Sequence, residues 1–261
     1  MVAGAGAVSA DTLRFFKALA DETRMAIVRL LTISDLRAGE IVERVQLPQN
    51  AVSYHLRQLR EAGLLRDRRS SSDARDVYYS VDLDRLQALY QRSGDELRAR
   101  LPEHDPLHAA LQERVRPLRI LYLCTHNSAR SQMAEALTRH IGGAQVEVHS
   151  AGSFPTRVHP LTLELLGECG VDTSGLASKS LEQFVGQHFD YVITVCDRAR
   201  DACPTFPNDP VKIHWSFADP TLERDPDEQR KAFLRLRREL QTRIRYLLSL
   251  PHPATGERLR F

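Results

Sequence analysis

The side chains best suited to chemistry gather in the second half of this 261-residue chain. All four cysteines, Cys124, Cys169, Cys196 and Cys203, lie after residue 120. A structural disulfide framework is unusual in a chain of this size with no recognisable secretion signal. Catalytic or redox use of the thiols is therefore the first hypothesis.

Cys124 opens the most informative segment, Cys-Thr-His-Asn-Ser-Ala-Arg-Ser. An apolar run at 118–123 reads as a buried strand, five residues follow the cysteine, and a helix is expected to open at Arg130. A loop of this length can wrap its backbone N–H groups around a tetrahedral oxyanion, while the helix N-terminus adds positive potential. Arg130 would supply a planar fork of donors for two oxygens of the anion.

The same positive field favours the thiolate of Cys124, which makes it a nucleophile at neutral pH. Ser131 is close enough to help hold that thiolate, and the side-chain amide of Asn127 could brace the loop. The expected anion-binding residues are Thr125, His126, Asn127, Ser128, Ala129 and Arg130. The alternative is a buried cysteine at a strand end and an unrelated surface arginine, since the spacing alone would be a weak signal.

The rest of this half alternates between strands and helices. Strands are expected at 118–123, 145–150, 191–195 and 211–214, and helices at about 128–140, 161–169 and 227–250. Such alternation predicts an α/β fold with a parallel sheet flanked by helices.

The first half has a mainly α pattern. Helices are expected at 11–19, around 25–31, at 39–45 and at 48–62, with Pro48 at the first helical position and Gly63 as the stop. Two short strands around the polar tip at 70–73 make a hairpin, and a helix follows at 82–100. This order of elements is that of a winged helix-turn-helix.

The helix at 48–62 would bury Val52, Leu56 and Leu59 and leave its polar face free to enter a DNA major groove. The residues of that face are Gln49, Asn50, Ser53, Tyr54, Arg57 and Gln58. Arginines beside the hairpin tip could contact phosphates: Arg66, Arg68, Arg69 and Arg75. The alternative is a solvated hairpin on a protein-interaction module.

These patterns divide the chain into a tail at 1–10, a winged-helix domain at 11–100, a proline-containing linker with a short helix at 101–117, an α/β domain at 118–250 and a tail at 251–261. His104 and His108 in the linker have helical spacing but are expected to be solvent-exposed, so no metal site is predicted.

Composition sets broad limits. With 42% apolar and 27% charged residues and a net charge of +2, the chain is globular, and its charge alone demands no nucleic-acid partner. No stretch approaches the ~18 apolar residues of a membrane span, and the first residues lack the basic start of a signal peptide. We expect a cytoplasmic protein with reduced thiols and no membrane association.

The cysteine loop resembles the active-site loop of the low-molecular-weight tyrosine phosphatase fold, which includes the thioredoxin-coupled arsenate reductases. The similarity covers about 118–250 and includes Ser150-Ala151-Gly152, Ser178-Lys179-Ser180 and the segment from His214 to Pro220. It implies that Asp219, which precedes Pro220, is a general acid. A simple turn-forming Asp-Pro pair is the alternative.

The remaining cysteines distinguish between a phosphatase and a reductase as the function of this domain. The segment from Val195 to Pro204 is similar to the redox segment of the reductases, whereas a phosphatase has no use for Cys196 and Cys203. The resemblance implies that Cys124 attacks arsenate, that Cys196 attacks Cys124 and releases arsenite, and that Cys203 then moves the disulfide to an accessible loop. Thioredoxin or a similar dithiol would be the reductant, with no bound cofactor.

Alternatives to this relay remain. They are a tyrosine phosphatase, or two unrelated cysteines of which one is buried. Cys169 follows an apolar helical pattern and is expected in the core, and Trp215 is expected to pack near the acid. Ala129 stands where some family members carry a further cysteine, which removes no step of the relay.

Segments 19–24 and 52–65 resemble the ArsR/SmtB family of winged-helix regulators, over about 10–95. The resemblance implies operator DNA as a partner and a two-fold dimer paired through the helices at 11–19 and 82–100. Arsenite-responsive relatives carry cysteines before the recognition helix, but 35–41 has none, so the effector stays unassigned. We expect an arsenate reductase fused to a regulator of arsenic detoxification, or a regulator whose second domain only senses oxyanions.

Overall fold

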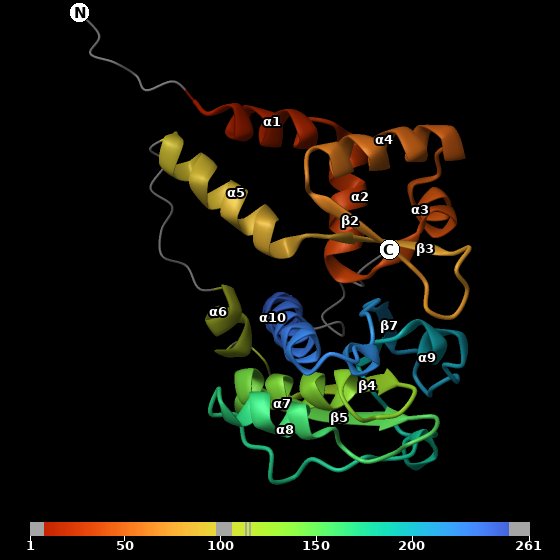
Figure 1. The fold of residues 1–261 in the computed structure, drawn as a ribbon. Coiled ribbons are helices and arrows are strands. Elements are labelled where there is room, and N and C mark those ends of the chain that lie inside the picture. The colour runs from red at the N-terminus through yellow and green to blue at the C-terminus, as the bar shows by residue number, and fades with distance from the viewer. Residues whose placement is uncertain (1–7, 98–105, 113, 115, 251–261) are drawn as a thin grey trace, which may run out of the picture. The chain divides into compact units, whose positions relative to one another are not determined.

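The computed structural model describes residues 8–97, 106–112, 114 and 116–250, which form two compact units. The first contains α1 (Ala10–Leu19), α2 (Glu22–Ile33), β1 (Leu36–Arg37), α3 (Ala38–Val45), α4 (Gln49–Glu61), β2 (Leu65–Arg69), β3 (Val77–Val81) and α5 (Leu83–Glu96) (Figure 1). The second contains α6 (Pro106–Gln112), β4 (Leu118–Cys124), α7 (Arg130–Gly142), β5 (Val146–Gly152), α8 (Pro160–Gly167), β6 (Tyr191–Thr194), α9 (Asp197–Asp201), β7 (Val211–His214) and α10 (Pro226–Ser249). Three short 3-10 helices, η1 (Gly143–Gln145), η2 (Leu181–Gln183) and η3 (Pro220–Leu222), complete it.

The first unit is a winged helix-turn-helix, as predicted. β2 and β3 form the expected antiparallel hairpin, with Leu65 opposite Val81, and β1 pairs with the other edge of β3. The predicted inner face of α4 is buried in a core shared with α2 and α3. α4 ends before Gly63, whose φ of 71° is the left-handed conformation that glycine adopts without strain.

Three details of the first unit differ from the sequence prediction. β1 has only two residues, too few for an alternating pattern to be recognised. Pro48 precedes the first helical residue of α4 instead of occupying it. α5 ends at Glu96, and residues 98–100 of the expected helix lie outside the described residues.

The second unit is the predicted α/β fold. Its sheet is parallel with strand order β5-β4-β6-β7, which puts β4 in the interior of the sheet, and β4 is buried along almost its whole length. α7 packs on β4 and β5, and α10 packs on α7 (Figure 1). The carboxyl ends of β4 and β5 meet where Cys124 pairs with Gly152, so the cysteine lies at the edge of a parallel sheet where ligands usually bind.

The short helix that the sequence predicts in the linker is α6, which packs on α10 and buries Leu107. The segment between Cys196 and Cys203, expected as an accessible loop, contains α9, a helix too short to show a periodic pattern. His108 is exposed, and His104 and most of the expected tails lie outside the described residues.

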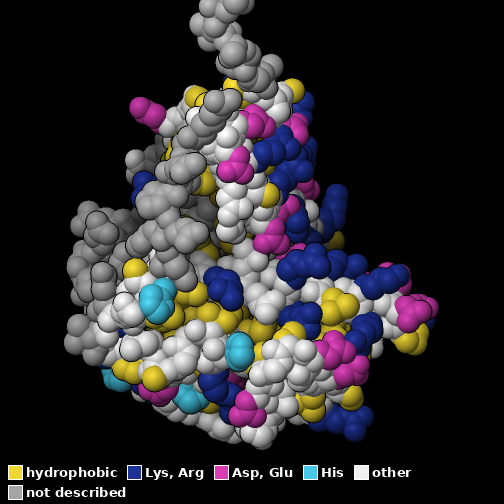
Figure 2. Space-filling view, turned by 90° about the vertical axis from the view of Figure 1, so that its left-hand side faces the viewer, with side chains coloured by type: hydrophobic (Ala, Val, Ile, Leu, Met, Phe, Trp, Pro, Cys, Tyr) yellow, Lys and Arg dark blue, Asp and Glu magenta, His cyan; other side chains and the backbone are white. Residues whose placement is uncertain are grey.

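Basic and acidic side chains are interspersed on the face shown in Figure 2, in keeping with the small net charge. Within the described part of the chain, no helix is both long and apolar enough to cross a membrane.

Candidate active site

The loop after β4 folds back on the cysteine that opens it. The backbone N–H of Asn127 donates to Cys124 Sγ at 3.1 Å, and Ser131 Oγ lies 2.9 Å from the same sulfur. Both Cys124 and Ser131 are buried. A backbone N–H and a hydroxyl group therefore converge on the sulfur, an arrangement that can stabilise a thiolate.

Asn127 locks the loop in shape. Its φ of 47° is uncommon for a residue other than glycine, although asparagine tolerates it better than most. Its Nδ2 donates to Ser131 Oγ at 2.9 Å and to Ser150 Oγ at 2.7 Å. Its Oδ1 accepts from Gln132 Nε2 at 2.8 Å and from the Lys179 N–H at 2.7 Å. Both donors and both lone pairs of the amide are thus used, which supports the predicted bracing role.

The carbonyl groups of the loop are turned away from the pocket. Those of Thr125, His126 and Ser128 accept the N–H groups of Phe154, Thr156 and His159 at 2.9, 3.0 and 3.0 Å. Because a trans peptide holds its N–H opposite its carbonyl, the next N–H in each unit points to the inner side of the loop. The loop therefore presents a ring of donors suited to an oxyanion.

Gly152 allows this close packing. A Cβ atom at residue 152 would lie 2.7 Å from the Thr125 carbonyl oxygen and 2.9 Å from the Asn127 nitrogen. Only glycine fits there, which gives a structural reason for the glycine of the Ser150-Ala151-Gly152 motif.

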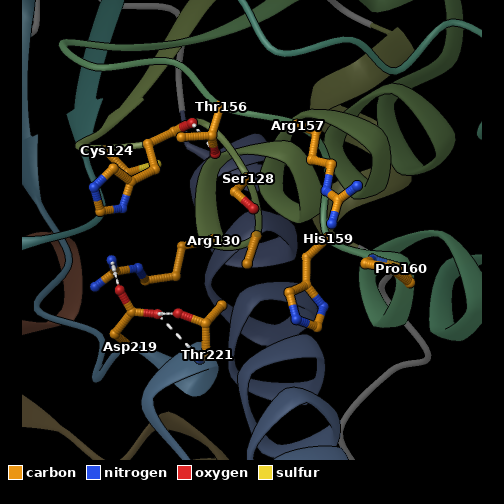
Figure 3. A pocket seen from close by; sticks show the side chains of 11 residues that line it. Cys124, Ser128, Arg130, Thr156, Arg157, His159, Pro160, Asp219 and Thr221 are labelled. Carbon is orange, nitrogen blue, oxygen red and sulfur yellow. Dashed lines mark hydrogen bonds and ion pairs between the residues drawn. The ribbon is translucent and has the colours of Figure 1, made fainter.

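Arg130 opens α7 and reaches back across the loop. Its Nη2 forms an ion pair with Asp219 Oδ2 at 2.5 Å, and its Nη1 donates to the Phe217 carbonyl at 3.3 Å (Figure 3). The other carboxylate oxygen of Asp219 accepts from the N–H and the hydroxyl of Thr221 at 3.1 and 2.7 Å. The structure thus brings the predicted acid and the predicted anion-binding arginine to the same site.

A pocket of about 560 Å³ opens beside these residues. It is lined by Cys124, His126, Ser128, Ala129, Arg130, Thr156, Arg157, His159, Pro160, Asp219 and Thr221. Of the predicted anion-binding residues, Thr125 and Asn127 do not line it, because their side chains point to the protein interior.

Cys196 follows β6 and packs against the anion loop. Its Sγ lies 3.4 Å from Thr125 Oγ1, and the side chain is buried. Burial raises the pKa of the Cys196 thiol; the nearby Cys124 acts in the same direction, and Arg130 opposes them. Cys196 is therefore close to Cys124 but held mainly as a neutral thiol.

Cys203 lies just beyond α9 and is half-buried, which is less accessible than the sequence suggested. Burial raises the pKa of its thiol, with Lys212 opposing the change. All four cysteines carry free thiols.

Sequence reasoning missed a buried polar network behind Cys196. Asp197 Oδ1 accepts from Ser216 Oγ at 2.7 Å and contacts His214 Nε2 at 3.1 Å, and His214 Nδ1 lies 2.8 Å from Thr194 Oγ1. This network ties the first residue of α9 to β6 and β7. The only signal in the sequence was the motif around His214.

A second unforeseen network centres on Glu135 of α7. Its buried carboxylate accepts from Ser150 Oγ at 2.5 Å, from Lys179 Nζ at 3.0 Å and from Arg139 Nη2 at 2.5 Å. Through Ser150 it continues to Asn127 and so to the loop. The charges are compensated, as burial of a carboxylate requires.

Cys169 and Trp215, also noted in the sequence, make packing and hydrogen-bond contacts. Cys169 is half-buried, donates to the Leu165 carbonyl at 3.2 Å and contacts Arg237 Nη1 at 2.7 Å. Trp215 is buried against Tyr122 and Phe217, with ring centroids 5.9 and 6.3 Å apart.

The first unit presents the candidate nucleic-acid surface. On α4, Gln49, Asn50, Ser53, Tyr54 and Arg57 are exposed and Gln58 is partly so. The Arg57 guanidinium lies 5.8 Å from the Tyr54 ring centroid. At the hairpin, Arg69 is exposed, Arg68 is half-buried and donates to the Arg69 carbonyl, and Arg75 pairs with Asp73 at 2.7 Å.

Residues 119–251 match the family model described as low molecular weight phosphotyrosine protein phosphatase, and the chain belongs to this family. Residues 19–68 match a helix-turn-helix domain model. Among curated relatives, the arsenate reductase of Halalkalibacterium halodurans is 39% identical over 127 residues, which are 48% of this chain and 91% of the relative. The arsenate reductase of Bacillus subtilis is 35% identical over the same shares.

One solved structure covers more of the chain. It is a thioredoxin-dependent arsenate reductase of Corynebacterium glutamicum, 25% identical, with a TM-score of 0.42, covering 86% of this chain and 96% of its own.

Proposed function

We propose that this protein is an arsenate reductase fused to a winged-helix DNA-binding regulator. The observation that carries the proposal is the contact of Cys196 with the anion loop, 3.4 Å from Thr125, with Cys203 only one short helix further along. A phosphatase needs the nucleophile, the arginine and the acid, but no second and third thiol. Reduction of arsenate needs two electrons, which thiols can supply.

The first step is nucleophilic. The loop N–H groups and Arg130 bind arsenate, and the Cys124 thiolate attacks arsenic. One arsenate oxygen leaves as water after Asp219 donates a proton. Ser131 and the Asn127 N–H stabilise the thiolate before attack.

The second step transfers two electrons. Cys196 attacks the sulfur of Cys124, the sulfur–arsenic bond breaks, and its electron pair stays on arsenic, which leaves as arsenite. Cys203 then attacks Cys196, which gives a Cys196–Cys203 disulfide and returns Cys124 as a thiolate. A thioredoxin-like dithiol reduces this disulfide.

The relay requires movement of α9. Cys203 starts half-buried beyond that helix, and the Asp197 contacts with His214 and Ser216 hold its beginning. Formation of the second disulfide therefore requires α9 to unwind or shift. The same movement exposes the Cys196–Cys203 disulfide to the reductant.

The test is arsenate-dependent NADPH consumption with thioredoxin and thioredoxin reductase. We expect turnover by the wild type and by the matched control Cys169→Ala, but not by Cys124→Ala, Cys196→Ala or Cys203→Ala. Cys203→Ala should still release one arsenite per chain in a single turnover. No consumption by the wild type, together with efficient hydrolysis of an aryl phosphate, would establish a phosphatase instead.

The first unit would bind operator DNA through α4, supported by its exposed polar face and by the match to a helix-turn-helix model. We expect binding that weakens with salt and prefers a palindromic operator. Arg57→Ala should lower that preference more than Arg44→Ala, an exposed arginine on α3. Equal affinity of the wild type for operator and random duplex would reject sequence-specific regulation.

α1 and α5 would pair two copies of this unit. They contact each other and expose the apolar side chains Leu13, Phe16 and Tyr90, at 48, 42 and 55%. Exposed apolar side chains on two neighbouring helices favour a two-fold interface. Light scattering should give a dimer for the wild type and a monomer for Phe16→Glu, whereas a monomeric wild type would contradict the proposal.

A further inference from the structure

The pocket beside the anion loop is larger than one tetrahedral oxyanion needs. Its volume is about 560 Å³. Four oxygens, each about the size of a water molecule of roughly 30 Å³, occupy on the order of 100 Å³. The space beyond the loop is lined chiefly by Thr156, Arg157, His159 and Pro160.

This outer wall is held in register with the loop. The Thr156 N–H donates to the His126 carbonyl and the His159 N–H donates to the Ser128 carbonyl, both at 3.0 Å. Arg157 lies between these two anchor points. The backbone of Arg157 is therefore held near the loop by hydrogen bonds at both sides.

The orientation of the His159 ring is also fixed. Its Nδ1 accepts the Leu161 N–H at 3.3 Å, and the ring stacks on Phe233 with centroids 4.9 Å apart. A neutral ring with Nδ1 as acceptor carries its proton on Nε2. Burial lowers the pKa of His159, so the neutral ring, with one N–H donor, is the main form at neutral pH.

The guanidinium group of Arg157 is available to bind a ligand. Among the described residues, its guanidinium makes no hydrogen bond or ion pair with another side chain, and it lies on the same wall as His159 (Figure 3). Asp219 supplies the one carboxylate of the pocket lining, and both of its oxygens are taken by Arg130 and Thr221. The wall thus offers a positive charge and an N–H donor.

We propose that Arg157 and His159 form a subsite for a second anionic group. The ligand is a small compound whose phosphate, phosphonate or arsenate head occupies the loop and whose carboxylate or second phosphate reaches this wall. Arg157 binds the second group by charge and His159 by a directed hydrogen bond. The inference rests on the proposed function only in taking the loop as the anion site, and it requires no step of the thiol relay.

The experiment compares three phosphonates by calorimetry on the full chain with reduced thiols, at about 0.15 M salt. Methylphosphonate occupies the loop alone. Phosphonoacetate and 3-phosphonopropionate add a carboxylate at two different distances from the phosphonate. The proteins are the wild type, Arg157→Gln, Arg157→Glu, His159→Gln and the matched control Arg238→Gln, an exposed arginine of α10.

In the wild type we expect at least one carboxylate ligand to bind about tenfold tighter than methylphosphonate. This gain in affinity should persist in Arg238→Gln and be smaller in His159→Gln. It should be absent in Arg157→Gln, and in Arg157→Glu the carboxylate should weaken binding relative to methylphosphonate. Methylphosphonate affinity should change little in His159→Gln and Arg238→Gln, and in the Arg157 variants it should fall less than the affinity for the carboxylate ligands.

Two failures are distinguishable. If methylphosphonate binds but neither carboxylate ligand gains affinity, or if the gain survives Arg157→Gln, the subsite is disproved while the proposed function stands. If no ligand of the series binds the wild type, the loop is not an anion site and both proposals fail together.

Discussion

Arg130 and Asp219 form an ion pair at the mouth of the anion loop, with 2.5 Å between Nη2 and Oδ2. The proposed chemistry needs the same guanidinium to bind oxyanion oxygens and the same carboxyl group to donate a proton. A bound anion must therefore share Arg130 with Asp219 or displace it. The ion pair, together with the contacts to Phe217 and Thr221, determines which way both side chains face.

Replacement of Asp219 should separate binding from chemistry. Asp219→Asn removes a negative charge that faces the anion and frees Arg130, so we expect phosphate to bind about fivefold more tightly. The single-turnover rate of arsenite release should fall by about 10²-fold or more, because the proton donor is lost. Calorimetry with phosphate and quenched-flow arsenite assays measure the two effects.

The control for this variant is Asp227→Asn, an exposed carboxylate in the first turn of α10. It should change neither quantity. Weaker phosphate binding by Asp219→Asn would show that the carboxylate orients Arg130 for the anion and does not compete with it.

The sequence allowed the loop to be foreseen because its parts are close along the chain. Cys124, Asn127 and Ser131 lie within eight residues between a strand and a helix, so local geometry determines their contacts. The networks around Glu135 and Asp197 join residues up to 44 positions apart and depend on how α7, β5 and β7 pack. No pattern of spacing reveals such contacts, and a five-residue helix such as α9 has too few turns to show a period.

The first disulfide should form faster as the pH rises. Burial raises the pKa of Cys196 above its ordinary value of 9.0, so the neutral thiol predominates at neutral pH and the attacking thiolate is scarce. By linkage, the raised pKa stabilises the fold below the ordinary pKa, and this contribution is lost as the pH rises through the folded value. Arsenite release by Cys203→Ala in single turnovers, from about pH 7 to about pH 10, should accelerate throughout.

A rate that levels off below about pH 8 would contradict this expectation. It would mean that the oxyanion adduct moves Cys196 out of its buried site before the thiol ionises. Thr125→Val, which removes the hydroxyl beside Cys196 Sγ, should slow the reaction at every pH and leave phosphate affinity unchanged, because the Thr125 side chain does not line the pocket.

Gly152 should tolerate no side chain. In Gly152→Ala, the new Cβ would meet the Thr125 carbonyl oxygen and the Asn127 nitrogen at 2.7 and 2.9 Å, so the loop must shift. We expect weaker phosphate binding by about tenfold or more and a loss of about 2 kcal/mol in unfolding free energy. Gly167→Ala is the control because nothing lies within 4 Å of its Cβ. Normal phosphate affinity in Gly152→Ala would show that the loop can adapt.

The ion pair between Lys179 and Glu135 should stabilise the second unit far more than an ion pair of similar length on the surface. Its Nζ lies 3.0 Å from Glu135 Oε2, and the two side chains are 21 and 3% exposed. Lys179→Met leaves a buried carboxylate with less compensation, so we expect a loss of about 2 kcal/mol, since Arg139 still pairs with Glu135. Lys231→Met breaks a 2.8 Å pair with Glu228 in which the two side chains are 61 and 52% exposed, and should leave the free energy of unfolding nearly unchanged.

The single tryptophan makes this comparison possible in the full chain. Trp215 is buried in the second unit, so its fluorescence during urea unfolding reports that unit alone. Because the Glu135 network continues through Ser150 to Asn127, Lys179→Met should also weaken phosphate binding, whereas Lys231→Met should not. Equal urea midpoints for the two variants would mean that water or Arg139 satisfies Glu135 without Lys179. A lower midpoint with unchanged phosphate affinity would show instead that the network supports the fold but does not shape the loop.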